Sequence, residues 1–470
     1  MRRLLWVFAF VGIGAACGAR DDGASTVGSG SDAGASTSTA AVTFHRDVEP
    51  LLQSRCQSCH TPGGIGPFSL LSYEDARSHA SRIVTETSAR RMPPWGARVT
   101  SECKPPHGYV GDPSLTDAEL ALLAAWRDAG APEGDPKDAP PPRAAVAIPG
   151  FESPVSLTPD QAFTATGDTD TLRCFVLDPK IQDTRFIRGT FFAPSNPSVV
   201  HHALAYAIPA NATVPGDVYD CFGGPGVKGA SLVAAWAPGG VPTVYPKDVA
   251  LPVQAGTRFV MQVHYHPHAN ASPEPDRTAF QVSYATGIPA YVVLTYLIGN
   301  FAQPVDADGA GLLPGPNDPP SGPEFLVPKD TKGHVEKMQF VVPSTYQGKA
   351  VGELRVLGVG AHMHLVGVDE RISLTPKDGS GEVCLLHEPA WSFDWQRGYA
   401  FDAPIESLPK VVPGDRFDFR CTYDNTKDNP ALLRAMTEAR VPETAPVHLG
   451  ESTLDEMCLG AFSFVRKLIP

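Results

Sequence analysis

Two histidines separated by a single residue are the first side chains in this sequence that suggest chemistry. His362 and His364 lie in residues 354–367, a run rich in β-branched and small residues that predicts a buried strand. Side chains alternate between the faces of a strand, so both imidazoles project together and can chelate one metal ion. Imidazole suits copper, zinc, iron and nickel, so the pair alone names no metal. The alternative is two satisfied polar residues beside a cleft.

Three further stretches add candidate metal ligands. In chain order they contain His201 with His202, His264, and Met457. Together with the first pair, and in this order, they resemble the type II, ascorbate-dependent copper monooxygenases, whose animal members include peptidylglycine α-hydroxylating and dopamine β-monooxygenases. The resemblance covers about residues 151–470.

The resemblance implies two copper sites with different tasks. His201, His202 and His264 match the copper that receives electrons. Neighbouring residues of a regular strand face opposite sides, so the adjacent pair requires a twisted or bulged strand. The residues that match the copper that meets O2 are His362, His364 and Met457. A soft thioether favours Cu(I), the state that must meet O2. His266 and His268 match no ligand of the family.

A haem-attachment motif precedes these stretches. Cys56, Cys59 and His60 form C-x-x-C-H, in which both thiols bond to the porphyrin and the histidine coordinates the iron. A thioredoxin-like redox pair would need a βαβ context that is missing here. Met92, followed by two prolines, is the expected sixth ligand and would raise the reduction potential. The alternative for Met92 is a place in the core.

The segment after this motif completes a small helical domain. Residues 115–130 have helical periodicity, an N-capping Thr116 and a glycine stop. This helix resembles the C-terminal helix of class I cytochromes c. From residue 151 onward, short β-like runs alternate with turn residues, which is typical of antiparallel sandwiches. The expected fold is therefore multidomain, with a small all-α cytochrome c-like domain followed by two antiparallel β-sandwich, jelly-roll-like copper domains.

Length and composition indicate how the chain divides into segments. Its 470 residues are too many for one core. In order we expect a lipoprotein-type signal peptide at 1–17, a flexible tether at 18–42, the cytochrome c-like domain at 43–134, a linker at 135–150, and copper domains at 151–310 and 311–470. Cys17 would be lipidated, which places the protein in the bacterial periplasm or at the cell surface, anchored to a membrane by lipid; cleavage without lipid is the alternative. The net charge of −13 argues against nucleic acid and anionic lipid as partners.

The remaining cysteines fit an exported protein, because disulfides form in oxidising compartments. The resemblance implies two of them, Cys174–Cys221 and Cys421–Cys458. The second would immobilise the backbone beside Met457. Cys103 and Cys384 are left over, and they either stay reduced or bridge the cytochrome to the second copper domain.

Departures from the family's pattern bear on the substrate. Family members that act on peptides hold a carboxylate with an arginine, an asparagine and a tyrosine. The matching positions here are Gly360, Leu459 and Ala461, which offer no such grip. The expected substrate is therefore a small, apolar molecule rather than a peptidylglycine.

The sequence thus predicts a copper monooxygenase that places one oxygen atom of O2 in a C–H bond and releases the other as water. The fused haem c would feed electrons to the first copper, after an external donor, ascorbate-like or a redox protein, has reduced it. The main alternative is an exported haem- and copper-binding protein that sequesters copper or relays electrons. An electron-transfer module that docks an external oxidase is a weaker one. A hydrolytic zinc site is disfavoured by the methionine and the lack of an activating carboxylate nearby.

Overall fold

The computed structural model describes residues 41–468 apart from short gaps. The gaps are residues 63, 65, 143–150, 167–170, 222–223, 237–239, 266, 268–273, 301–310, 316–317, 347, 439 and 451–453. The predicted signal peptide, most of the tether, the lipidation candidate Cys17, and both His266 and His268 lie outside the described residues. The rest forms two compact units, one from residues 41–95 and 111–142 and the other from 96–110 and 151–468.

The first unit is helical. Its helices are η1 (Phe44–Val48), α1 (Glu49–Arg55), α2 (Tyr73–Ser78), α3 (Ala80–Ser88), α4 (Asp117–Asp128) and η2 (Pro136–Asp138). Thr116 caps α4 in a reciprocal capping box with Glu119. Phe44, Leu52 and Trp126 are buried in a common core. None of the described helices is both long and apolar enough to cross a membrane.

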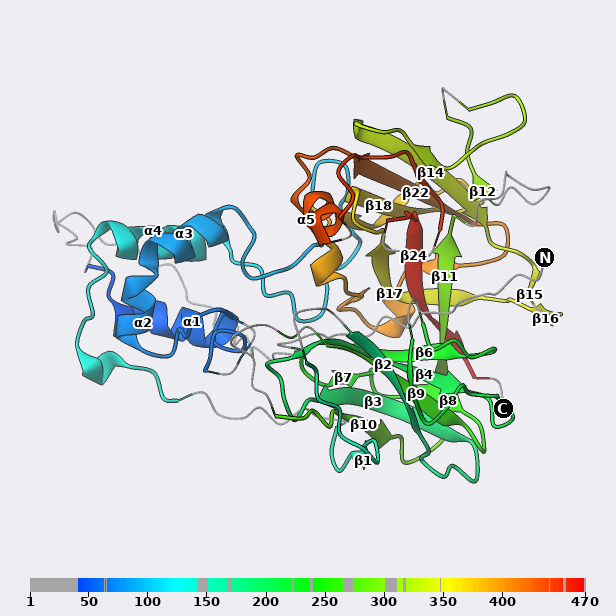
Figure 1. Ribbon diagram of the computed structural model, residues 1–470, viewed down its shortest axis with the longest axis horizontal. Helices are drawn as coiled ribbons and strands as arrows, with labels where there is room; N and C mark the ends of the chain where they lie inside the picture. The colour runs from blue at the N-terminus through cyan, green and yellow to red at the C-terminus, as the bar shows by residue number, and fades with distance from the viewer. Residues whose placement is uncertain are drawn as a thin grey trace, which may run out of the picture. The chain divides into compact units, whose positions relative to one another are not determined.

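The second unit is built almost entirely of strands, in agreement with the predicted β-sandwich class (Figure 1). A five-stranded sheet carries the first histidine set. Its strands, in spatial order, are β5 (Val218–Asp220), β2 (Thr171–Leu177), β9 (Arg258–Tyr265), β4 (Val200–Ile208) and β6 (Ser231–Trp236).

A ten-stranded sheet runs through both halves of this unit. Its main path is β1 (Val155–Leu157), β10 (Ala279–Tyr284), β3 (Arg185–Ala193), β8 (Val249–Val253), β11 (Tyr291–Gly299), β24 (Leu459–Lys467), β17 (Leu354–His362) and β20 (Tyr399–Ala400). Beside this path, β7 (Thr243–Val244) pairs with β3 and β21 (Lys410–Val411) pairs with β17. The pairing of β11 with β24 makes one continuous sheet of segments that the sequence assigns to two separate domains.

A second five-stranded sheet lies in the C-terminal half. Its strands are β12 (Gly311–Leu312), β14 (Lys332–Val341), β22 (Arg416–Asp424), β18 (Gly367–Thr375) and β19 (Val383–Glu388). The remaining elements are β13 (Leu326–Val327) with β23 (Val447–His448), β15 (Thr345–Tyr346) with β16 (Lys349–Ala350), η3 (Phe393–Trp395), η4 (Ile405–Ser407) and α5 (Pro430–Glu438).

Aromatic side chains show how the sheets pack. Phe259 of β9 and Phe280 of β10 are buried, with ring centroids 5.3 Å apart. Phe417 of β22 and Phe462 of β24 are also buried, with ring centroids 4.7 Å apart. Each five-stranded sheet therefore packs against part of the ten-stranded sheet, which gives two sandwiches that share one large sheet.

Residues 96–110, called the strap below, join the β unit although they lie between α3 and α4 in the sequence. The boundaries predicted from the sequence place them in the helical domain at 43–134. The structure instead bonds Cys103 to Cys384 of β19, a pairing that the sequence left open.

Candidate metal centres

The first centre depends on a bulge in β4. Strand β4 pairs with β9 so that His202 lies opposite His264, and the register shifts between Val200 and His202. His201 is the extra residue at this shift, which allows both adjacent histidines to join one cluster. The Nδ1 atom of His202 lies 3.2 Å from that of His201 and 3.3 Å from that of His264.

These distances suit a shared ion. Two imidazole nitrogens bound tetrahedrally at about 2.0–2.1 Å from a metal lie about 3.3 Å apart. One possible ligand atom from each of the three histidines lies within 4.8 Å of the others, and the three residues are half-buried. The cluster therefore has the spacing of a three-imidazole metal site that small molecules can reach.

The second candidate centre begins where β17 ends. His362 is the last residue of β17, and the rings of His362 and His364 lie 5.4 Å apart at an interplanar angle of 87°. The Nδ1 atom of His362 bonds to Gln396 Oε1 at 2.8 Å, and that of His364 bonds to the Asp455 carbonyl at 2.9 Å. Such bonds fix the tautomer and orient Nε2 as the nitrogen suited to a metal.

Glu456 brings Met457 to this pair. Its Oε1 atom accepts the N–H of His364 and, at 2.8 Å, the N–H of Met457. Its Oε2 atom accepts the N–H groups of Val366 at 3.2 Å and Gly367 at 3.1 Å. One buried carboxylate thus fixes the backbone of two candidate ligands relative to each other.

Met457 is also held from its other side. Cys458 forms a disulfide with Cys421, and the hydroxyl of Tyr423 donates to the Met457 carbonyl at 2.8 Å. The structure also contains the Cys174–Cys221 disulfide, so both pairs implied by the resemblance are present.

Buried titratable side chains lie near the second centre. Burial lowers the pKa of His362 to about 4, so its imidazole is neutral and able to bind a metal at neutral pH. Burial also raises the pKa of Glu388 and of Glu456 to about 8, and that of Glu370 well above its usual range. A bound cation would favour the ionised form of each carboxylate.

These carboxylates were not predicted from the sequence, which indicated none near the histidines. Glu370 accepts the N–H of His362 at 3.1 Å, and Glu388 lies opposite Glu370 in the sheet. Glu370 and Glu456 therefore hold the backbone of the two candidate histidines. Gln396 was also missed, because its contact with His362 depends on a loop that folds back from elsewhere in the chain.

The side chains that neighbour His362 in the sheet are apolar. Across β24, Leu459 lies opposite His362 and Ala461 lies opposite Gly360. Leu297 of β11 lies opposite Ala461, and it forms a buried cluster with Leu459 and Ala461 against which Met457 packs. Residues directly opposite each other in antiparallel strands share a face, so apolar side chains lie beside His362.

In the helical unit, the C-x-x-C-H motif lies just after α1. Cys56 and Cys59 are outside the three disulfides. The Nδ1 atom of His60 bonds to the Phe68 carbonyl at 3.0 Å, which orients the ring for coordination through Nε2. Burial raises the pKa of Cys56 to about 12, unlike the lowered values of redox-active C-x-x-C pairs. Met92, the expected sixth ligand, follows α3 and donates its N–H to the Glu86 carbonyl at 3.2 Å.

Comparison with known proteins gives one distant relative. The chain is 22% identical over 280 residues to the mouse (Mus musculus) protein named DBH-like monooxygenase protein 2. The match covers 58% of this chain and only 39% of that protein. This similarity points toward the monooxygenase family that the four sequence stretches resemble. No family model matches the chain.

Similarity to solved structures is weak. The major capsid protein P2 of bacteriophage PM2 aligns with a TM-score of 0.28 and 7% identity, over 67% of this chain and 98% of that one. A putative secreted protein from Eubacterium rectale aligns with a TM-score of 0.20 and 8% identity, over 65% of this chain and 68% of that one. Neither alignment carries an argument about fold or function.

Proposed function

We propose that this protein is a copper-dependent monooxygenase that hydroxylates a C–H bond of a small, apolar substrate with O2. The observation that carries the proposal is that two separate groups of candidate ligands differ in chemistry. One contains three histidines, and the other combines a histidine pair with a methionine held by Glu456 and a disulfide. The similarity to a protein named as a monooxygenase supports the same class.

The two proposed copper sites have different roles. His201, His202 and His264 would hold a copper that passes electrons, because three neutral imidazoles suit both Cu(I) and Cu(II). The set of His362, His364 and Met457 would hold the copper that, when bound, supplies O2 activation. Two electrons are needed for each O2 molecule that is split.

The chain's own residues favour an apolar substrate at the second set. Leu459 and Ala461 lie on the same sheet face as His362, within a buried apolar cluster. Gly360 leaves no side chain at the position where the family places an arginine. A carboxylate buried there would lack a partner, which disfavours an anionic substrate.

Haem c is the proposed route for electrons. Cys56 and Cys59 would form the thioethers, with His60 and Met92 as axial ligands and an external reductant as the donor. We expect the purified protein to keep its haem after denaturation and acid–acetone extraction, because the attachment is covalent. The Cys56→Ser/Cys59→Ser variant should release it. Absorbance of the denatured protein measures this, and haem lost equally from both would contradict covalent attachment.

The three disulfides indicate an exported protein, because such bonds persist in oxidising compartments. We further propose a bacterial periplasmic or surface location with a lipid anchor at Cys17.

Oxygen consumption tests the proposed monooxygenase activity. The copper-loaded protein, supplied with ascorbate and a panel of small apolar compounds, should consume O2 faster when a substrate is present, with hydroxylated product formed in equal amount. The His364→Ala variant should lose this substrate-dependent part by about 100-fold or more, as expected when one ligand of a metal site is lost. Copper bound tightly with no substrate-dependent uptake for any compound would favour the alternative, a protein that sequesters copper or relays electrons.

A further inference from the structure

The strap is fastened to the β unit by covalent and main-chain bonds. Cys103 forms its disulfide with Cys384 across a sequence separation of 281 residues. At the end of the strap, the N–H of Val110 donates to the Ala400 carbonyl of β20 at 2.9 Å. The strap is therefore seated against β19 and β20, and β20 pairs directly with the ligand strand β17.

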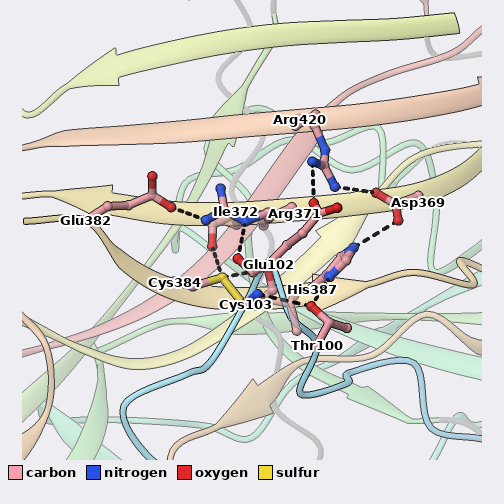
Figure 2. Close-up of polar contacts among 11 residues, drawn as sticks. Thr100, Glu102, Cys103, Asp369, Arg371, Ile372, Glu382, Cys384, His387 and Arg420 are labelled. Carbon is pink, nitrogen blue, oxygen red and sulfur yellow. Dashed lines mark hydrogen bonds and ion pairs between the residues drawn. A yellow bond between two sulfur atoms is a disulfide. The ribbon is translucent and has the colours of Figure 1, made fainter.

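A polar network secures the middle of the strap (Figure 2). The hydroxyl of Thr100 bonds to His387 Nδ1 at 2.9 Å, and His387 Nε2 bonds to Asp369 at 2.9 Å. Arg420 of β22 forms ion pairs with Glu102 at 2.6 Å and with Asp369 at 3.4 Å. The network links the strap to three neighbouring strands of the C-terminal sheet.

The first residue of the strap packs on a buried acid. Gly96 donates its N–H to the Tyr399 hydroxyl at 3.1 Å. A Cβ atom at position 96 would lie 2.2 Å from Glu388 Oε2 and 2.8 Å from the Tyr399 hydroxyl oxygen. Both Glu388 and Tyr399 are 1% exposed, so neither can move aside into solvent.

The buried acid connects the strap to the second metal centre. Glu388 lies directly opposite Glu370 of β18 in the C-terminal sheet. The Glu370 carboxylate accepts the N–H of His362 at 3.1 Å, and Tyr399 pairs with Val359 of β17, three residues before His362. The strap therefore packs on a buried acid whose neighbour in the sheet holds the backbone of His362.

We propose that the strap is a positioning element for the second metal centre, acting through Tyr399 and Glu388 on the backbone that carries His362. Seating of Gly96 fixes the Glu388 carboxylate, Glu388 packs beside Glu370, and Glu370 holds the backbone N–H of His362. The inference rests on the proposed copper site at His362, His364 and Met457 but not on the reaction. Outer partners of metal ligands typically change metal affinity by about 10–100-fold.

Coupling of this kind is reciprocal. If a seated strap strengthens metal binding, a bound metal must strengthen seating of the strap by the same factor. Copper bound at the second centre should therefore protect the Cys103–Cys384 disulfide from reduction.

Two alanine substitutions in the strap test whether its seating affects the second metal centre. Gly96→Ala places a methyl group against Glu388, whereas a Cβ atom at Gly108 meets nothing within 4 Å. Neither glycine has a positive φ, so the backbone accepts alanine at both positions. Competitive Cu(I) titration and the Cu(II) EPR spectrum are measured at both centres for the full-length parent and both variants. Tyr399→Phe, which removes only the linking hydroxyl, is the third variant.

We expect Gly96→Ala and Tyr399→Phe to weaken copper at the second centre by about 10-fold and to change its EPR hyperfine splitting. The first centre and Gly108→Ala should match the parent. Parental affinity and spectrum in Tyr399→Phe, with Gly96→Ala also parental or unfolded, would overturn the inference and leave the proposed function intact. An equal loss in Gly108→Ala would also overturn it, because any disturbance of the strap would then suffice. A parent that binds no copper at the second centre would remove the proposed function and the inference with it.

Discussion

Replacing His202 with alanine is expected to remove copper from the first centre and leave the second centre loaded. The Nδ1 atom of His202 lies within 3.3 Å of the Nδ1 atoms of both His201 and His264, so it is the middle ligand of the cluster. Four-ligand structural zinc sites bind with roughly 10–16 kcal/mol, so one ligand accounts for about 3 kcal/mol, or on the order of 100-fold in affinity. Copper content after dialysis, and competitive titration, measure the loss.

A histidine outside both centres gives the control for this substitution. His448 is exposed on β23, and His448→Ala should retain the copper content of the parent. The EPR spectrum of the His202→Ala protein should keep only the signal of the second centre. If the variant keeps the full copper content and both signals, the three histidines do not form a metal site.

The candidate ligand residues could be named from the sequence because their signals are local. An H-x-H pair in a β-branched run, adjacent histidines and a C-x-x-C-H motif each fit within a few residues of sequence. The adjacency of His201 and His202 even required a bulge, and the register shift of β4 occurs there. That His202 lies opposite His264 could not be derived, because the register between distant strands depends on the whole sheet.

The buried carboxylates could not be predicted for a related reason. A charged residue in a strand pattern normally indicates the solvent face, since glutamate is seldom fully buried without partners. Glu370 and Glu388 are 0% and 1% exposed, and the N–H group that Glu370 accepts is that of His362, at the end of β17. Only the closed fold shows that this strand supplies an N–H group to a buried acid.

The attachment of the strap to the β unit could not be predicted because of its position in the sequence. It lies between the haem motif and helix α4, two features that belong together, and it carries no periodic pattern of its own. The partner of Cys103 cannot be deduced from sequence, because cysteine spacing does not fix connectivity. The predicted boundaries of 43–134 therefore enclosed a segment that contributes to the β unit.

Removal of the Glu456 carboxylate is expected to have the largest effect on stability. Its two oxygens accept four buried backbone N–H groups, which converge from both sides of the second centre. Each buried donor left without an acceptor costs about 1–3 kcal/mol, so Glu456→Ala should destabilise the apoprotein by about 4 kcal/mol or more. Glu456→Gln keeps one carbonyl oxygen but turns an amide donor toward two of the N–H groups, so we expect about 2–4 kcal/mol.

Urea denaturation of the apoprotein, followed by intrinsic fluorescence, measures these losses without any contribution from metal. The matched control is Glu443→Gln, which removes a carboxylate that is 69% exposed and pairs only loosely with Lys329 and Lys427 at 3.7 and 3.5 Å. Such surface pairs contribute about 0–1 kcal/mol, so this variant should unfold close to the parent. If Glu456→Ala also unfolds within about 1 kcal/mol of the parent, the N–H groups find other acceptors. The backbone of His364 and Met457 would then be set by the Cys421–Cys458 disulfide and the Tyr423 hydroxyl rather than by Glu456.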